Sequence, residues 1–206
     1  MPTRQQASPA APARVIVLNG ASSSGKTALA KAMQARWGSP LHHVQLDAFR
    51  DMEPPGYWDD WERLDESLVD SMVCALCSAM YAAVREYATH GQEVVLDTVL
   101  NNRHARRLLV ERLADLPVHL VGVHCDPSEL TRREAMRESR EIGLAATQVE
   151  WIHKPMHYDF QVETTEKKPE DAHFGERDRR FRKRDRFGAD AVLRREDCRN
   201  DVVMRG

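Results

Sequence analysis

Long hydrophobic runs are missing from this 206-residue sequence. No apolar stretch approaches the roughly 20 residues that a membrane-spanning helix needs. Residues 1–13 are rich in alanine, proline, serine and glutamine, and they lack the apolar centre of a secretory signal peptide. The sequence therefore predicts a cytoplasmic protein without a membrane partner, and a flexible N-terminal tail over residues 1–13.

A strong excess of one charge is missing too. The formal net charge is -2 and 42% of the residues are hydrophobic, which excludes a basic nucleic-acid binder or a disordered polyelectrolyte for the chain as a whole. The chain has only four cysteines. Cys74 and Cys77 form a C-x-x-C pair inside a helical pattern, without a second pair, so we expect core packing rather than zinc or redox chemistry.

The most informative stretch runs from Gly20 to Thr27 and contains two of the ten glycines. It fits the phosphate-loop pattern G-x-x-x-x-G-K-[ST]. A short apolar run, 14–19, precedes it and is typical of a buried strand, and the helix formers of 28–37 follow it. Strand, loop and helix are the context that this pattern requires. The expected nucleotide-binding residues are Gly20, Ala21, Ser22, Ser23, Ser24, Gly25, Lys26 and Thr27.

The chemistry of this loop follows from its position before a helix. Unpaired backbone N–H groups and the helix dipole would bind phosphate there. Lys26 would reach the β- and γ-phosphates of ATP, and the Thr27 hydroxyl would ligate Mg²⁺. The chain has no N-K-x-D sequence of the kind that guanine-binding proteins use, which favours ATP over GTP.

The rest of the chain alternates between strand and helix patterns. This alternation predicts an α/β fold with a right-handed, doubly wound, five-stranded parallel sheet flanked by helices. In the helix expected over 64–90, apolar residues recur on one face, and we interpret this stripe as core. The expected strands are 14–19, 41–47, 93–100, 117–125 and 158–164; the expected helices include 28–37, 64–90, 103–116, one that starts at Asp126, and 143–154. The stripe consists of Leu64, Leu68, Met72, Leu76, Met80, Val84 and Tyr87.

Two aspartates follow apolar strand patterns. Asp47 is expected at the carboxyl end of the second strand, where parallel sheets bind ligands; a helix cap or a turn is the alternative. Asp97 ends an apolar run in the third strand, as does the Mg²⁺-linked carboxylate of many nucleotide-binding folds. Asp97 would hold the metal through water, or it would orient the molecule that accepts the phosphoryl group.

The loop 51–63 gathers aromatic residues, Tyr57, Trp58 and Trp61 among them. They would form a pocket wall or lid for an apolar or aromatic acceptor, or else a small cluster that anchors the loop.

The helix that starts at Asp126 carries several arginines. Arg133, Arg137 and Arg140 are spaced to share one face, which could clamp a transferring phosphoryl group. The alternative is a solvated face, paired with neighbouring glutamates.

The last residues differ in composition. Residues 174–206 hold 11 Lys or Arg and 7 Asp or Glu, with few apolar residues. We expect a charged, poorly ordered tail over 173–206 after a P-loop domain over 14–172, and the interspersed acidic residues argue against an RNA-binding arm.

Taken together, these motifs resemble chloramphenicol 3-O-phosphotransferase and its small-kinase relatives. The resemblance covers 15–172. It rests on the phosphate loop, on Asp47 and Asp97, and on the spaced arginine block; further matching positions are Gly143, Gln148, Tyr158, Asp159, Glu163, Thr164 and Thr165. The stretch 52–62 shows no matching motif, and the charged tail replaces the apolar closing helix of the family.

The resemblance implies a P-loop kinase fold like that of shikimate and nucleoside monophosphate kinases, with an arginine-bearing lid. It implies that Asp47 is the base that takes the proton of the acceptor hydroxyl, and that Arg133, Arg137 and Arg140 belong to the lid over ATP.

We therefore predict a kinase that uses ATP and Mg²⁺ to phosphorylate a hydroxyl of a small molecule, with an antibiotic such as chloramphenicol as the first candidate. The expected catalytic residues are Asp47, Lys26, Arg137 and Arg140; Arg133 joins the nucleotide site, and Thr27 and Asp97 the metal site. The alternatives are a metabolic kinase of the shikimate or gluconate type, and a nucleotide-binding switch without acceptor turnover. The sequence does not predict the oligomeric state.

Overall fold

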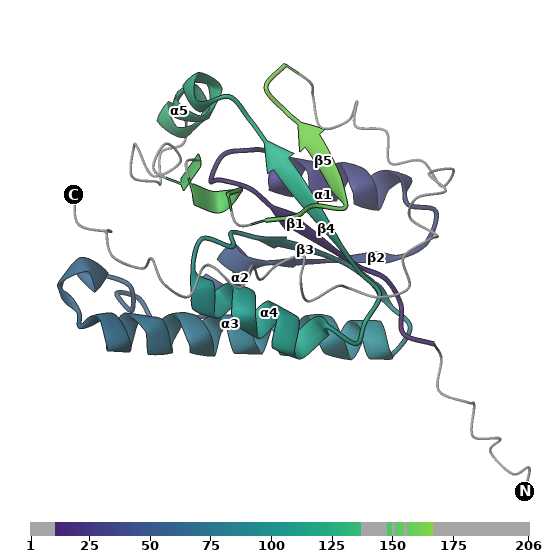
Figure 1. The fold of residues 1–206 in the computed structure, drawn as a ribbon, viewed down its shortest axis with the longest axis horizontal. Helices are drawn as coiled ribbons and strands as arrows, with labels where there is room; N and C mark the ends of the chain where they lie inside the picture. Colours follow the sequence, from purple (N-terminus) through teal and green to yellow (C-terminus); the bar gives the residue numbers. More distant parts are fainter. Residues whose placement is uncertain (1–10, 137–147, 150, 155, 167–206) are drawn as a thin grey trace, which may run out of the picture.

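A computed structural model describes residues 11–136, 148–149, 151–154 and 156–166 of the chain. Its centre is a five-stranded sheet in the order β2-β3-β1-β4-β5, in which all neighbouring strands are parallel (Figure 1). The strands are β1 (Val15–Asn19), β2 (Leu41–Gln45), β3 (Glu93–Thr98), β4 (Val118–His124) and β5 (Phe160–Glu163). The predicted five-stranded parallel sheet is confirmed.

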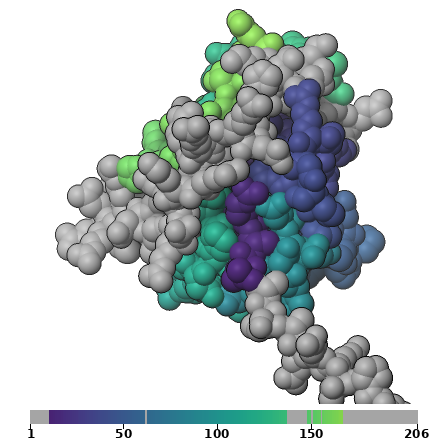
Figure 2. All heavy atoms as spheres, turned by 90° about the vertical axis from the view of Figure 1, so that its right-hand side faces the viewer, coloured from purple at the N-terminus to yellow at the C-terminus, as the bar shows by residue number. Residues whose placement is uncertain are grey.

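Helices cover both faces of the sheet. They are α1 (Lys26–Arg36), α2 (Leu46–Arg50), α3 (Glu66–Thr89), α4 (Arg103–Leu113) and α5 (Pro127–Ala135), with a 3₁₀ turn at Trp61–Arg63. In Figure 1, α3 and α4 lie side by side below the sheet, while α1 lies above it. The chain enters the sheet at β1, and Figure 2 views this end, where the first described residues, in purple, lie between later segments in teal.

The alternation of side chains along the strands divides the core between these two layers. Val15 and Val17 of β1 face α3 and α4, whereas Ile16 and Leu18 face α1. All four are fully buried, because β1 is the central strand and has a helical layer on each side.

Three helices each begin at a polar residue whose side chain caps the first turn. The side chains of Asp65, Asn102 and Asp126 accept hydrogen bonds from backbone N–H groups in the first turns of α3, α4 and α5. Gly91, with φ of 75°, follows the end of α3 in the left-handed conformation that glycine adopts without strain. The helix start that the sequence predicts at Asp126 is confirmed.

The apolar stripe of α3 lies in the core only over its middle. Met72, Leu76, Met80 and Val84 are buried, but Leu68 and Tyr87 are 49% and 41% exposed. The prediction that the whole stripe is core was therefore wrong in the first turns, where α3 extends beyond the sheet that it covers (Figure 1), and at Tyr87, whose partly exposed ring stacks on His42. The expectation that no apolar stretch approaches the length of a membrane span was wrong, because α3 is long and apolar enough to cross a membrane by length and composition alone. Its buried face packs in the hydrophobic core, which makes it a core helix of this fold.

Cys77 also lies in this core, as predicted, and burial raises the pKa of its thiol to about 11. Cys74, one turn earlier, is half-buried, and both thiols are free. The charged stretch 173–206 and half of the predicted helix over 143–154 lie outside the described residues.

Candidate active site

The phosphate loop connects β1 to α1 at the carboxyl edge of the sheet. Its two glycines serve different purposes. A Cβ on Gly20 would lie 2.4 Å from the carbonyl oxygen of Val123, so only glycine allows the loop to approach β4 this closely. Gly25 has φ of 91°, a left-handed conformation that other residues rarely adopt, and the loop turns there into the first residue of α1.

The loop forms a polar cradle at the N-terminus of α1. Lys26 is buried, and its ammonium donates hydrogen bonds to the carbonyl oxygens of Gly20 and Ala21, at 2.8 and 2.9 Å. The hydroxyl oxygens of Ser23 and Ser24 are buried and have no hydrogen-bond partner within the described part of the chain. Buried donors without partners are costly, and a phosphate in the cradle would give these hydroxyls acceptors. The cradle therefore fits the phosphates of a nucleotide.

Thr27 and Asp97 meet beside the cradle. The Thr27 hydroxyl donates a hydrogen bond of 2.6 Å to Asp97 Oδ2, and Gln45 Nε2 lies 3.4 Å from the same hydroxyl. His43 Nε2 is 3.6 Å from Asp97 Oδ2. A hydroxyl and a carboxylate are oxygen ligands of the kind that Mg²⁺ prefers. The pair therefore fits the predicted metal site.

The surroundings of Asp97 keep it ionised. Burial by itself raises the pKa of this carboxyl, but His43, the charge of Lys26 and the Thr27 hydroxyl together hold its pKa below the ordinary value. Asp97 is thus a carboxylate at neutral pH, as a metal-linked role requires.

Asp47 lines the same cleft as the phosphate loop. The cleft is lined by Ser22, Ser23 and residues 25–28 of the loop and α1, together with Gln45, Asp47 and Asp97. The prediction that Asp47 ends a strand was wrong, because β2 stops at Gln45 and Asp47 lies in the first turn of α2. The helical turn still keeps Asp47 at the carboxyl edge of the sheet, half-buried and beside Lys26 and Thr27.

The aromatic loop lies outside the lining of this cleft. Trp58 packs edge-on against Tyr57, lies under the guanidinium of Arg50, and donates a hydrogen bond from its indole to Glu53. Tyr57 and Trp61 remain 42% and 46% exposed.

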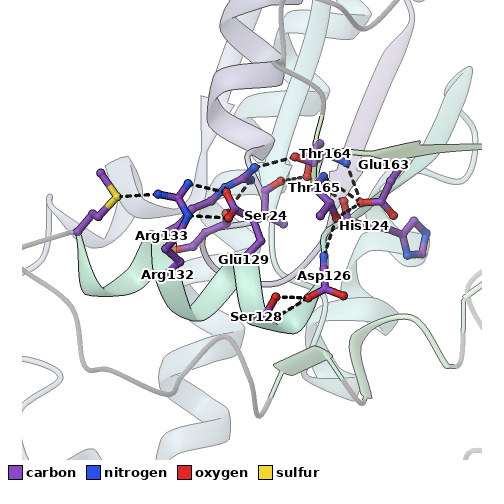
Figure 3. A network of polar contacts seen from close by, with 12 residues as sticks. Ser24, His124, Asp126, Ser128, Glu129, Arg132, Arg133, Glu163, Thr164 and Thr165 are labelled. Carbon is purple, nitrogen blue, oxygen red and sulfur yellow. Dashed lines mark hydrogen bonds and ion pairs between the residues drawn. The ribbon is translucent and has the colours of Figure 1, made fainter.

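Arg133 approaches the phosphate loop from α5 (Figure 3). Its guanidinium donates to Glu129 Oε1 at 2.7 Å, to the carbonyl oxygen of Thr164 at 2.6 Å, and to that of Ser23 at 3.4 Å. Arg132 forms a second ion pair with Glu129, and the two arginines lower the pKa of Glu129 to about 2. Arg133 thus lies beside the loop, as its predicted nucleotide role requires.

Comparisons with known proteins agree with this geometry. The family described as "Chloramphenicol phosphotransferase-like protein" matches residues 13–175. The chain belongs to this family. Proteins named as O-phosphotransferases from two strains of Mycobacterium tuberculosis are each 33% identical over 178 residues, which cover 74% of this chain and 75% of theirs. The chain is accordingly a P-loop phosphotransferase that acts on a small molecule.

Solved structures share the fold. A sugar kinase from Janibacter sp. superposes with a TM-score of 0.56 at 21% identity, covering 77% of this chain and 89% of that one. Mycobacterium tuberculosis APS kinase, in complex with AMPPNP and APS, also gives 0.56, at 15% identity, with 78% and 93% covered. A tunicamycin resistance protein from Deinococcus radiodurans gives 0.52 at 15% identity, with 77% and 90% covered.

Most predicted site residues converge. The phosphate loop, Asp47 and Asp97 share one cleft, while Arg137 and Arg140 lie outside the described residues. The sequence did not point to His43, which faces Asp97, and it gave no role to Asn19, a family position directly before the loop. It gave no role to Gln148 or Tyr158, although both match family positions. The one signal in the sequence was the polar Asn19 at the end of an apolar strand, directly before the loop. The structure shows that this side chain is fully buried.

Proposed function

We propose that this chain is a kinase that uses ATP and Mg²⁺ to phosphorylate a hydroxyl of a small molecule, with chloramphenicol as the first candidate acceptor. The observation that carries the proposal is the shared cleft of the phosphate loop, the Thr27–Asp97 pair and Asp47. These residues are the proposed hydrogen-bond donors to phosphate, the proposed metal ligands and the proposed base, and they line one cleft. Membership of the family supports phosphoryl transfer to a hydroxyl.

Each residue has a proposed role. The loop amides and Lys26 hold the β- and γ-phosphates, for which Lys26 leaves its carbonyl partners at Gly20 and Ala21. Thr27 and Asp97 hold Mg²⁺, which would neutralise charge on the phosphates.

Asp47 accepts the proton of the acceptor hydroxyl while that oxygen attacks the γ-phosphorus and the bond to the β-phosphate oxygen breaks, releasing ADP. A positioned base of this kind contributes about 10²–10⁴ in rate.

The arginines complete the proposed site. Arg133 contacts the loop from α5, and Arg137 and Arg140 continue the same sequence spacing beyond the described residues. We propose that they stabilise the charge that develops on the transferring phosphoryl group.

The test is ADP release from purified chain with Mg-ATP, measured against a panel of hydroxylated acceptors. The panel contains chloramphenicol, other hydroxylated antibiotics, and acidic metabolites of the shikimate and gluconate type. We expect one class of acceptor to stimulate ADP release well above the acceptor-free rate, and chloramphenicol to be in it. Stimulation by an acidic metabolite alone would contradict the antibiotic acceptor but keep the kinase. ATP binding without stimulation by any acceptor would favour the switch instead.

A further inference from the structure

The phosphate loop contains a backbone conformation that needs outside support. Ser23 has φ of 61°, in the left-handed region that residues other than glycine seldom adopt. Such a conformation persists only where surrounding contacts fix it. The residues on either side of Ser23 are held by segments distant in sequence: the N–H of Ser22 donates to Gln148 Oε1 at 2.7 Å, and the carbonyl oxygen of Ser24 accepts from the Thr164 hydroxyl at 2.7 Å.

Asn19 holds the root of the loop. It is fully buried at the end of β1, directly before Gly20. Its amide nitrogen donates to the Tyr158 hydroxyl at 2.7 Å and to the carbonyl oxygen of Ile152 at 3.2 Å. Its amide oxygen accepts from the N–H of Leu100 at 2.8 Å, just beyond the strand that carries Asp97. One side chain thus links the phosphate loop, the metal-site strand and the 148–158 segment.

Tyr158 is itself fixed from three directions. Asn19 donates to its oxygen, and His153 Nδ1 lies 2.7 Å from the same oxygen. A neutral His153 with its proton on Nε2 serves as the acceptor of the Tyr158 O–H. Its ring lies on Gly122, where an added Cβ would come within 2.7 Å of a ring atom. The hydroxyl therefore has both a donor and an acceptor in a rigid frame, and it can hold Asn19 in a single orientation.

The 148–158 segment is anchored in the core where it is described. Ile152 is fully buried and Met156 is 8% exposed. Val149 packs against a cluster that includes Ala21 of the phosphate loop. Gln148 and Tyr158 therefore extend from a packed support and not from a free loop.

We propose that Gln148, Asn19 and Tyr158 are positioning residues that hold the phosphate loop in its nucleotide-receiving conformation before the nucleotide arrives. The inference rests on the proposed function, because it assigns a purpose to the loop as a nucleotide site. A loop that is already ordered loses less conformational freedom on binding, so these contacts strengthen nucleotide affinity without touching the nucleotide.

The test compares MgADP affinity across matched variants of the full chain, by calorimetry at a temperature where every variant is folded. Gln148→Met removes the acceptor of the Ser22 N–H, and Tyr158→Phe removes only the hydroxyl that holds Asn19. Exposed Gln161→Met and half-exposed Tyr87→Phe are the controls for the same chemical changes elsewhere. Each test variant should raise the Kd about 3–10-fold, the equivalent of one hydrogen bond, while each control stays within about 2-fold.

Amide hydrogen exchange without nucleotide gives a second readout. The amides of Ser22 to Ser24 should exchange faster in both test variants than in the wild-type chain. A lower Tm with unchanged Kd and unchanged exchange at these amides would mean a merely structural role and would overturn the inference. Tighter MgADP binding in either variant would overturn it as well. Failure of the wild-type chain to bind MgADP would instead refute the proposed function, and the inference with it.

Discussion

At the scale of single residues, the site depends on groups whose ionisation the fold sets. Asp97 is held as a carboxylate, whereas burial, together with electrostatic interactions with His124 and Lys26, lowers the pKa of His153 to about 4. A neutral His153 is what the Tyr158 hydroxyl needs as an acceptor. The same fold thus keeps one group charged and another neutral within one active-site region.

The lowered pKa of His153 predicts a pH-dependent stability. As pH falls below the ordinary value of 6.5, the unfolded chain takes up a proton that the folded chain refuses until about pH 4. The free energy of unfolding should therefore fall across this window and, for this group, no further below it. Because His153 is only partly buried, we expect the free energy of unfolding to fall by about 1–2 kcal/mol, which is less than the full pKa shift would give.

The measurement is thermal unfolding of wild-type and His153→Gln chains from pH 7.5 down to pH 4, taken as a difference so that the titration of carboxylates cancels. The difference in Tm should shrink or change sign towards low pH, by about 2–4 °C for each kcal/mol. A difference that stays constant over this range would contradict the lowered pKa.

At the scale of elements, the N-terminal end of α3 behaves differently from its middle. Met80 is fully buried between the sheet and α4, whereas Leu68, on the same stripe three turns earlier, is half exposed. Met80→Ala should lower the free energy of unfolding by about 2–5 kcal/mol, since it leaves a cavity. Leu68→Ala is the matched control on the same helix and should change it by less than about 0.5 kcal/mol. Urea unfolding measures both, and equal losses would show that Leu68 is buried after all.

Local signals in the sequence were enough for much of this architecture. The phosphate loop and the start of α5 are each specified by residues within one or two turns, so their pattern predicts them directly. The end of β2 was harder, because Leu46 and Asp47 continue an apolar strand pattern and only the fold shows that they begin a helix. The sequence alone does not decide whether the strand continues through Asp47 or a helix begins there.

Contacts between distant segments could not be predicted in this way. Gln148 meets Ser22 across 126 positions, and Tyr158 meets Asn19 across 139. Hydrogen bonds of this kind depend on how β1, β4 and β5 are ordered in the sheet, and no local spacing encodes that. By contrast, the sequence did predict that Asp47 and Asp97 lie near the phosphate loop, because parallel strands bring their carboxyl ends to one edge of the sheet.

At the scale of the whole molecule, the sheet order explains why this chain can be a kinase. β1 lies between β3 and β4, so the phosphate loop has the Asp97 strand on one side and the strand that leads into α5 on the other. The proposed metal ligands and the proposed base lie on the first side, and Arg133 approaches from the second. The family membership and this arrangement agree on phosphoryl transfer.

The central claim is that Asp47 is the base of this transfer, and one paired measurement tests it most directly. ATP affinity and acceptor-stimulated ADP release are measured on the wild-type chain and on Asp47→Asn, with exposed Asp51→Asn as the control. We expect Asp47→Asn to bind Mg-ATP within about 3-fold of wild type but to lose about 10²–10⁴ in turnover, with the control unchanged. Turnover that survives in Asp47→Asn at the wild-type rate would contradict the account.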